Sequence, residues 1–502
     1  EEGKEKKKKD KSKIQKPVNI EWKGLEDRLE RLTLSSSFIA DMKASPDGEK
    51  LYYLSSRDDS YDLWELNIRE KKTKTIGNFK GGDASLAIDK KGENLFVLAG
   101  GSLYKVETKD GKSSPVSFKA EMVLDEDQEL AYLFEHMWRQ VVRKFYKKDL
   151  HGVEWDMMKT AYEKKLEHIN NDRDFAEMMS ELLGELNGSH TGCRYYHRNS
   201  EGNSTASLGI YADEKYDGAG IKIAEVIEKS PLAILDRNIQ AGMIITKIDG
   251  NTIEENENYY PLLNHKAGKT IVLEITDGNG KNTKTYKIKG LTLSEESNLR
   301  YERWVKSRRE ATEKLSDGKI GYVHVKGMNS SSFREVFQDL LGRYYDKEAI
   351  IVDTRFNGGG WLHDDLATLL SGEQYVKLMP RGQYIGSEPQ NKWQKPSAVI
   401  VGEGNYSDAH FFPFTYRALD IGKIIGMPVP GTTTAVWWER QINPNIVFGI
   451  PQVGVMDKQG NYLENNQLEP DVKVKNQPDE LIDGVDSQLQ KAVEVLLKEV
   501  GN

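Results

Sequence analysis

The sequence predicts a multidomain α+β protein, and three changes of pattern along its 502 residues support this fold class. Residues 36–120 alternate short apolar runs with turn signals, as β-strands do, whereas residues 121–200 switch to helical spacing. Residues 201–292 return to a β pattern, and residues 293–502 alternate strands with helices, as α/β domains do. Residues 1–35 begin with a run of Lys and Glu, which predicts a charged linker.

The composition excludes several classes of protein. Lys and Arg number 71 against 79 Asp and Glu, so the formal net charge is −8 and a nucleic-acid partner is not expected. No apolar run approaches the roughly 18 residues of a membrane span. A single cysteine, Cys193, excludes an intrachain disulfide and a Cys-rich zinc site. No grouping of Asp, Glu and His has metal-ligand spacing, so we predict neither a metal nor a cofactor.

The first β-rich segment contains an internal repeat. Two similar phrases have their turn glycines at Gly48 and Gly92, 44 residues apart, and each is followed by a second strand pattern. A period of about 40–45 residues with several strands per repeat is typical of a propeller blade. Two blades cannot close a ring. We therefore expect a propeller remnant belonging to a longer protein, and a small β-sandwich is the alternative.

The helical segment ends in a short polar loop. Its first helix is predicted by apolar residues at helical spacing, namely Leu130, Leu133, Phe134, Met137, Trp138 and Val141. Asn187-Gly188 is a typical helix end, and Ser189-His190-Thr191-Gly192 follows it.

The second β-rich segment resembles a PDZ domain. Four phrases carry the resemblance in this order: Ser207-Leu208-Gly209-Ile210, Ile221–Val226, Ser230-Pro231-Leu232-Ala233 and Ala241–Gly250. The resemblance implies a groove that captures an extended peptide by adding it to a sheet.

The last segment is predicted to be α/β. After a charged helix at Leu299–Leu315, strands are predicted at Ile320–Val325, Ala349–Asp353, Ser397–Val401 and Ile424–Ile425. Helices are predicted between them at Ser332–Tyr345, Asp364–Leu370 and Ala409–Leu419.

Three loops combine reactive side chains with glycine at the boundary of an element: residues 187–192, 352–360 and 403–409. In the second loop, Gly358, Gly359 and Gly360 let backbone amides approach a ligand, as in an oxyanion hole or an anion site. No Gly-Lys-Ser/Thr follows, so this is not a P-loop. In the third loop, Ser407 at a strand-to-helix turn is either an exposed nucleophile or a helix N-cap.

Together the three loops resemble the peptidase family that contains the tail-specific proteases, and more closely its tricorn branch. A late phrase agrees: Glu464-Asn465-Asn466-Gln467-Leu468-Glu469-Pro470-Asp471. Tricorn-like enzymes carry Glu-Asn-x-Gly-x-x-Pro-Asp there, so Gln467 departs from the pattern. The resemblance covers almost the whole chain and implies an α/β catalytic domain of the ClpP/crotonase-like fold.

The resemblance implies a role for each matching residue. Ser407 is the expected nucleophile, His190 its general base, and Glu464 the acid that orients the imidazole, with Ser189 hydrogen-bonding alongside. The backbone N–H groups of Gly360 and Asp408 form the expected oxyanion hole, and Gly358 and Gly359 are expected to contact substrate. These residue types fit the chemistry, because a serine hydroxyl needs a base and the base needs a carboxylate.

Alternatives exist for the base and the acid. Glu469 is the competing choice for the acid. A Ser-Lys enzyme of the tail-specific branch would carry its lysine about 25 residues after the serine, where this chain has Gly431-Thr432-Thr433-Thr434 and only Lys423 nearby. Cys193 follows His190 too closely for a productive Cys-His pair.

Three further histidines are assigned no catalytic role. His363 and His410 are expected to be wall or surface residues, and His324 to be packed. In the archaeal archetype an aspartate accepts a basic side chain downstream of the glycines, and ungapped spacing puts Leu378 there, so we predict neutral or apolar P1 residues.

The sequence therefore predicts a serine endopeptidase or oligopeptidase that acts on peptides through an acyl-enzyme. A non-catalytic peptide-binding scaffold and a Ser-Lys processing protease are the rivals. The resemblance implies a homo-oligomer and a cytoplasmic location, or a periplasmic one if an export signal has been removed.

Overall fold

The computed structural model divides into two compact units, residues 1–124 and residues 125–502. It describes residues 20–33, 36–197, 201–236, 238–278 and 280–501. The run of Lys and Glu that predicts a linker falls within residues 1–19, outside the described residues. Among the described helices, none is long and apolar enough to cross a bilayer.

The first unit contains two antiparallel sheets of four strands in sequential order. The first sheet consists of β1 (Ile39–Ala44), β2 (Lys50–Arg57), β3 (Ser60–Asn67) and β4 (Lys72–Lys80). The second consists of β5 (Ala84–Ile88), β6 (Asn94–Ala99), β7 (Ser102–Glu107) and β8 (Ser113–Pro115). One apolar core joins them, with Leu54, Leu63 and Leu95 fully buried. The repeat is thus present as two sheets, but the described residues form no closed propeller or barrel, so the propeller expectation is not confirmed.

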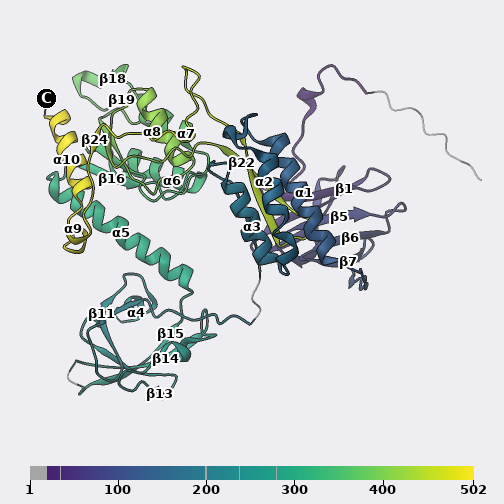
Figure 1. Cartoon of the computed structure of the whole chain (residues 1–502), viewed down its shortest axis with the longest axis horizontal. Helices are drawn as coiled ribbons and strands as arrows, with labels where there is room; N and C mark the ends of the chain where they lie inside the picture. Colours follow the sequence, from purple (N-terminus) through teal and green to yellow (C-terminus); the bar gives the residue numbers. More distant parts are fainter. Residues whose placement is uncertain (1–19, 34–35, 198–200, 237, 279, 502) are drawn as a thin grey trace, which may run out of the picture. The chain divides into compact units, whose positions relative to one another are not determined.

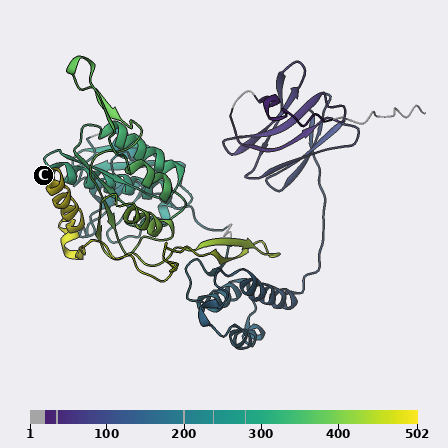
Figure 2. The same ribbon diagram turned by 90° about the horizontal axis from the view of Figure 1, so that it is seen from above.

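The helical region of the second unit packs on a small sheet made from distant segments (Figures 1 and 2). The helices are α1 (Glu126–Lys144), α2 (Trp155–Glu163) and α3 (Asp172–Gly184), with single turns at Leu150–Gly152 and Leu166–His168. The sheet has the order β22 (Ala435–Arg440), β23 (Ile446–Val453), β9 (Gly192–Tyr195). Alternate residues of β23, namely Ile446, Phe448 and Ile450, enter the helical core. This sheet joins segments that the sequence assigned to separate domains.

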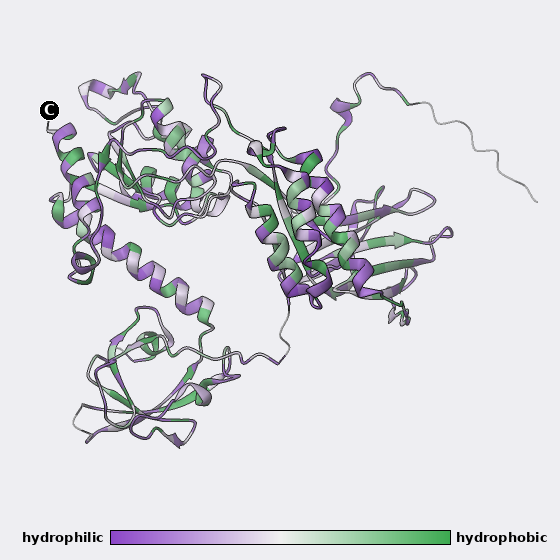
Figure 3. Ribbon diagram, viewed as in Figure 1, coloured by the Kyte–Doolittle hydropathy of each residue, from purple (hydrophilic) through white to green (hydrophobic). Residues whose placement is uncertain are grey.

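The PDZ-like segment is a sheet of order β10-β11-β12-β14-β15. Its elements are β10 (Ile210–Ala212), β11 (Ile221–Val226), α4 (Pro231–Leu235), β12 (Ile244–Ile248), β13 (Asn251–Thr252), a single turn at Tyr260–Leu263, β14 (Thr270–Thr276) and β15 (Thr283–Lys289). Helix α5 (Leu293–Leu315) then leads to the next sheet (Figure 1). This helix is largely hydrophilic (Figure 3), and a Thr292–Glu295 capping box starts it.

The last region contains a parallel sheet of order β16-β17-β20-β21-β24. The strands are β16 (Ile320–His324), β17 (Ala349–Asp353), β20 (Ser397–Val401), β21 (Lys423–Gly426) and β24 (Val472–Lys473). The helices are α6 (Ser330–Gln338), continued by a π-turn at Asp339–Arg343, α7 (His363–Leu370), α8 (Asp408–Ala418), α9 (Pro478–Ile482) and α10 (Ser487–Val500). A hairpin, β18 (Val376–Leu378) and β19 (Gly386–Glu388), follows α7, and a single turn at Pro380–Gly382 lies within it.

Both faces of the parallel sheet are covered, which explains why its strands are continuous apolar runs. Side chains of α6, α7 and α8 pack on one face and those of α10 on the other. β17 and β20 are neighbours in the sheet. Because the carboxyl ends of parallel strands meet at one edge, the glycine loop after β17 and the serine loop after β20 are brought side by side.

A buried ion-pair cluster fixes the start of the glycine loop. The Arg355 guanidinium donates to the Asp353 carboxylate at 2.6 Å and to the Asp486 carboxylate at 2.9 Å. All three side chains are at most 7% exposed. The cluster ties β17 to the N-cap of α10.

We expect Arg355→Met to destabilise the second unit by about 3–5 kcal/mol, because it leaves two buried carboxylates without their cation. The measurement is the free energy of unfolding from urea denaturation. The matched control is Arg139→Met on the surface of α1, which should change that free energy by under about 0.5 kcal/mol. Equal effects of the two substitutions would contradict this role for the cluster.

Candidate active site

Ser407 lies at the turn between β20 and α8 with a backbone conformation that L-residues rarely adopt. Its φ is 57° and its ψ −125°. It occupies the N-cap position of α8, yet its side chain caps no N–H group. The Ser407 hydroxyl is therefore not used to stabilise the start of α8. Backbone strain of this kind is typical of functional sites.

Close packing holds this strained turn in place. The Asn405 amide donates to Thr354 Oγ1 at 2.9 Å, and the Ser407 N–H donates to Thr432 Oγ1 at 3.0 Å. A Cβ atom on Gly359 would lie 2.5 Å from the Ser407 Cβ, and φ of Gly359 is +95°. Only glycine fits that position, which explains one glycine of the loop after β17.

The N–H groups of Gly360 and Asp408 have no hydrogen-bond acceptor within the part of the chain that the structure describes. Both residues line the same cavity as Ser407. The Gly360 backbone packs so tightly on Met328 that a Cβ would lie 2.0 Å from the Met328 carbonyl oxygen. Two unpaired amides beside a free hydroxyl suit the binding of a developing oxyanion.

The Asp408 side chain has a different role from its backbone N–H, because its carboxylate is bound by the first residues of α7. Its carboxylate accepts from the Leu362 N–H at 2.5 Å, from the His363 N–H at 3.1 Å and from His363 Nδ1 at 2.6 Å. It therefore fixes the start of α7, and only the Asp408 backbone is available to a ligand.

His190 comes from the loop between α3 and β9, more than 200 residues before Ser407 in the chain. Its φ is 63°, its N–H donates to the Tyr406 hydroxyl at 2.8 Å, and its ring lies 4.7 Å from the Tyr406 ring. Tyr406 directly precedes Ser407, so one residue of the serine loop also positions the histidine. His190 and Ser407 line one cavity.

A hydrogen-bond relay connects the imidazole to a buried carboxylate. Ser189 Oγ lies 2.8 Å from His190 Nδ1 and 3.0 Å from Glu464 Oε2. The Glu464 carboxylate, 3% exposed, also accepts from the N–H groups of Ser189, Thr433 and Thr434. We find no direct hydrogen bond between Glu464 and His190 among the described residues. The expected contact of the acid with the imidazole is instead bridged by Ser189, which the sequence had placed alongside.

This relay selects one imidazole tautomer. A carboxylate only accepts, so the Ser189 hydroxyl donates to Glu464 and accepts from Nδ1–H of His190. Nε2 then carries the lone pair, and it is the nitrogen that Ser189 and Thr434 leave unoccupied. Deprotonation of a serine requires a base with a nitrogen that is free to accept the proton.

Burial lowers the pKa of His190 to about 4, because desolvation disfavours the charged imidazolium. The nearby His410 is 1% exposed, and burial lowers its pKa to about 4 as well. Its Nδ1 accepts from the Thr432 N–H at 3.3 Å, and it does not line the cavity. Of these two histidines with lowered pKa values, His190 is the one that lines the same cavity as Ser407.

The cavity that contains Ser407 and His190 has a volume of about 610 Å³. One wall consists of the serine and glycine loops, including Gly358 and Trp361, and the other of β9, β22 and β23. No lysine or metal-ligand cluster occurs among the described residues that line it.

The competing residues lie elsewhere. Glu469 is exposed and contacts Lys473. Lys423 is exposed on β21 and does not line the cavity. Cys193 is buried in the helical core, and burial raises the pKa of its thiol to about 12, so it is a poor nucleophile.

Leu378 lies in the β18–β19 hairpin and is not among the residues that line the cavity. Its role in selecting P1 residues stays a prediction. Gln467, the departure from the family pattern, is exposed and has no positive φ, so the late loop keeps its place at Glu464 without a glycine.

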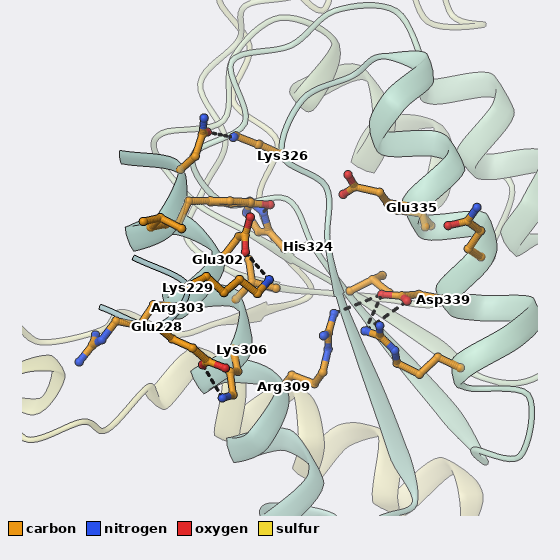
Figure 4. A pocket seen from close by; sticks show the side chains of 18 residues that line it. Glu228, Lys229, Glu302, Arg303, Lys306, Arg309, His324, Lys326, Glu335 and Asp339 are labelled. Atoms are coloured by element: carbon orange, nitrogen blue, oxygen red, sulfur yellow. Dashed lines mark hydrogen bonds and ion pairs between the residues drawn. The ribbon is translucent and has the colours of Figure 1, made fainter. Parts of the chain in front are cut away.

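A second cavity, of about 580 Å³, separates the PDZ-like segment from the parallel sheet (Figure 4). Its charged side chains pair with one another across it, as Lys229 does with Glu302 and Lys306 with Glu228. His324 on its wall is held by the Tyr301 hydroxyl at 2.8 Å. These contacts link α5 to the PDZ-like segment, and the described residues that line this cavity include no serine or cysteine.

Sequence reasoning missed the contribution of residues 432–434. The segment in which a Ser-Lys enzyme would carry its lysine supplies the hydroxyls of Thr432 and Thr434 and the backbone N–H of Thr433 instead. Thr432 holds the Ser407 N–H, and Thr434 Oγ1 lies 3.1 Å from His190 Nδ1. A run of three threonines directly after a glycine was the one signal in the sequence.

Three family models match the second unit of the chain. Peptidase family S41 matches residues 319–474, the C1 domain of tricorn protease matches residues 126–184, and the PDZ domain of tricorn protease matches residues 219–292. The matched segments together take in more than half of the chain.

Curated relatives carry the same family name. Tricorn protease homolog 1 of Streptomyces coelicolor is 26% identical over 374 residues, which cover 73% of this chain and 35% of that protein. The putative tricorn-like protease C-terminal subunit of Sulfurisphaera tokodaii is 26% identical over 517 residues, covering 96% and 58%. The tricorn protease of Thermoplasma acidophilum is 24% identical over 473 residues, covering 91% and 43%. The chain spans about half the length of these relatives.

A crystal structure of the tricorn protease shares the fold. It superposes with a TM-score of 0.79 at 21% identity, over 90% of this chain and 46% of that one. The fold agrees with the three family models, which match in the order that the sequence motifs have. The chain therefore belongs to the tricorn branch of peptidase family S41.

Proposed function

We propose that the chain is a serine endopeptidase or oligopeptidase that hydrolyses peptides through an acyl-enzyme. One observation carries the proposal: Ser407, with an uncommitted hydroxyl, shares a cavity with His190, whose Nδ1 is linked through Ser189 to Glu464. The family supports the same reaction class.

In this mechanism His190 Nε2 takes the proton of the Ser407 hydroxyl as Oγ attacks the peptide carbonyl carbon. The imidazolium is stabilised by Ser189, whose own hydroxyl is polarised by Glu464. The carbonyl oxygen becomes an oxyanion and accepts from the N–H groups of Gly360 and Asp408, where one donor contributes about 3–4 kcal/mol.

The tetrahedral intermediate then collapses. The carbon–nitrogen bond breaks, and His190 gives its proton to the leaving amine, which leaves an ester on Ser407. Water attacks this ester with His190 again as the base and releases the carboxylic acid product. The proposal requires no cofactor or metal.

The proposal also includes the substrates, the oligomeric state and the location of the enzyme. Peptides are the substrates, Gly358 and Gly359 contact them through their backbone, and neutral or apolar P1 residues are preferred. The family relationship supports a homo-oligomer and a cytoplasmic location, with the periplasm as the alternative.

Burst kinetics with a p-nitrophenyl ester test the acyl-enzyme directly. We expect a rapid release of about one p-nitrophenol per chain followed by a slower steady state, and cleavage of unstructured peptides by the same preparation. A peptide-binding scaffold would bind such peptides and leave them intact, with no burst.

The acid side of the pH profile follows from the lowered pKa of His190. The base works only when it is neutral, so kcat/KM has its full value above the pKa of His190 and decreases as the pH falls through that pKa. We expect the acid midpoint of kcat/KM below pH 6.5, toward pH 4. His410→Gln should keep this midpoint, because His410 does not line the cavity. A wild-type midpoint at or above pH 6.5 would contradict the assignment.

A further inference from the structure

Arg194 is a charged residue of the candidate cavity that the mechanism above does not use. It lies on β9, where Cys193 and Tyr195 pack against the helical core. Successive side chains of a strand point to opposite faces. Arg194 therefore projects from the other face of the sheet, which is the wall of the cavity that contains Ser407.

The Arg194 guanidinium is positioned by an aromatic ring. Its central carbon lies 4.2 Å from the centre of the Trp438 ring on β22. Gly449, on the strand between them, leaves room for this ring, since a Cβ there would lie 2.7 Å from Trp438. Stacking occupies the face of a guanidinium and leaves the N–H groups at its edge available to an acceptor.

Arg194 has no counter-charge in the part of the chain that the structure describes. Within the described residues its side chain makes no ion pair or hydrogen bond, and its contact with the Trp438 ring is the interaction that positions it. Among the described residues that line the cavity, Asp408 is the one acid, and its carboxylate is already held by Leu362 and His363. Within the described residues, the cavity therefore presents one cation, stacked on Trp438, that has no ion-pair partner.

We propose that Arg194 binds a carboxylate of the peptide substrate, so that the site prefers peptides with an acidic group near the cleaved bond. The planar guanidinium fork matches a carboxylate with two parallel hydrogen bonds. The carboxylate comes either from an Asp or Glu side chain or from the C-terminus of the peptide. This inference rests on the proposed function, because it places a substrate in the same cavity.

Binding to the Ser407→Ala variant tests the inference without relying on hydrolysis. The probes are fluorescent ten-residue peptides in which a single Glu or Gln is moved along the chain, each made with a free C-terminal acid and with a C-terminal amide. We expect at least one Glu position, or the free acid, to bind about 10-fold or more tighter than its neutral counterpart. The Glu–Gln pairs identify a side-chain carboxylate, and the acid–amide pairs identify the terminal one.

Substitution of Arg194 in the Ser407→Ala variant tests whether Arg194 causes the preference for acidic peptides. Arg194→Gln should reduce the ratio between acidic and neutral peptides to below about twofold, and Arg194→Glu should reverse it in favour of the neutral peptides. Arg173→Gln, an exposed arginine of α3 outside the cavity, should keep the ratio. Because the readout is a ratio for each variant, a general loss of folding does not produce it.

Equal affinity for acidic and neutral peptides, or a preference that persists in Arg194→Gln, would overturn the inference. Absence of hydrolysis by the unsubstituted chain would instead overturn the proposed function and leave the binding comparison valid.

Discussion

Ser407→Ala and His190→Ala should each lower kcat for peptide hydrolysis by about 10⁶-fold. The hydroxyl is the atom that forms the acyl-enzyme, and without the imidazole its proton has no acceptor in the cavity. Since the two groups act as a unit, the double variant should be no less active than either single variant. The measurement is steady-state hydrolysis of a fluorogenic peptide that the burst experiment has shown to be cleaved.

Two controls separate this result from nonspecific damage. Lys423→Ala removes the nearest candidate for a Ser-Lys base, and Cys193→Ser removes the only thiol. Lys423→Ala should retain most of the activity, because the residue is exposed and lies outside the cavity. A His190→Ala variant within tenfold of wild type, together with an inactive Lys423→Ala variant, would contradict the histidine assignment.

Glu464→Gln should lower kcat by about 10²–10⁴-fold with little change in KM, because an equivalent substitution in a serine protease triad costs about 10⁴. The carboxylate accepts four hydrogen bonds, two of them from Ser189. An amide would present an N–H group to some of these donors, so Ser189 would lose the acceptor that fixes its hydroxyl. The Nδ1 proton of His190 would then lose the Ser189 hydroxyl as its oriented acceptor.

Ser189→Ala should have an effect of the same kind, since it removes the bridge itself, although Thr434 still contacts the imidazole. The matched control is Glu469→Gln, an exposed acid five residues after Glu464, which should leave kcat within about twofold. If Glu469→Gln impaired kcat and Glu464→Gln did not, the competing acid would be the correct one.

The sequence predicted the scaffold of the site well where local pattern determines structure. The strands Ala349–Asp353 and Ser397–Val401 were predicted with the bounds that they have, because both are continuous apolar runs buried on two faces. Three glycines after one strand and a serine before a helix were sufficient to identify two loops. The two loops are adjacent because the strands that precede them are parallel neighbours in the sheet.

The sequence did not predict which strands that are distant along the chain pair with one another. β22 and β23 lie more than 200 residues after β9, yet the three form one sheet, and Arg194 and Trp438 meet across it. No local pattern specifies which distant strand pairs with a four-residue strand. The sequence named Ser189 as a hydrogen-bonding partner of the site, but its position between Glu464 and His190 depends on side-chain geometry that no local pattern specifies.

Covalent labelling with a fluorophosphonate, followed by peptide mapping, tests the central assignment most directly. The account predicts one adduct, on Ser407, in the wild-type chain and none in His190→Ala under the same conditions. An adduct on another residue, or labelling of Ser407 at an undiminished rate in His190→Ala, would contradict it.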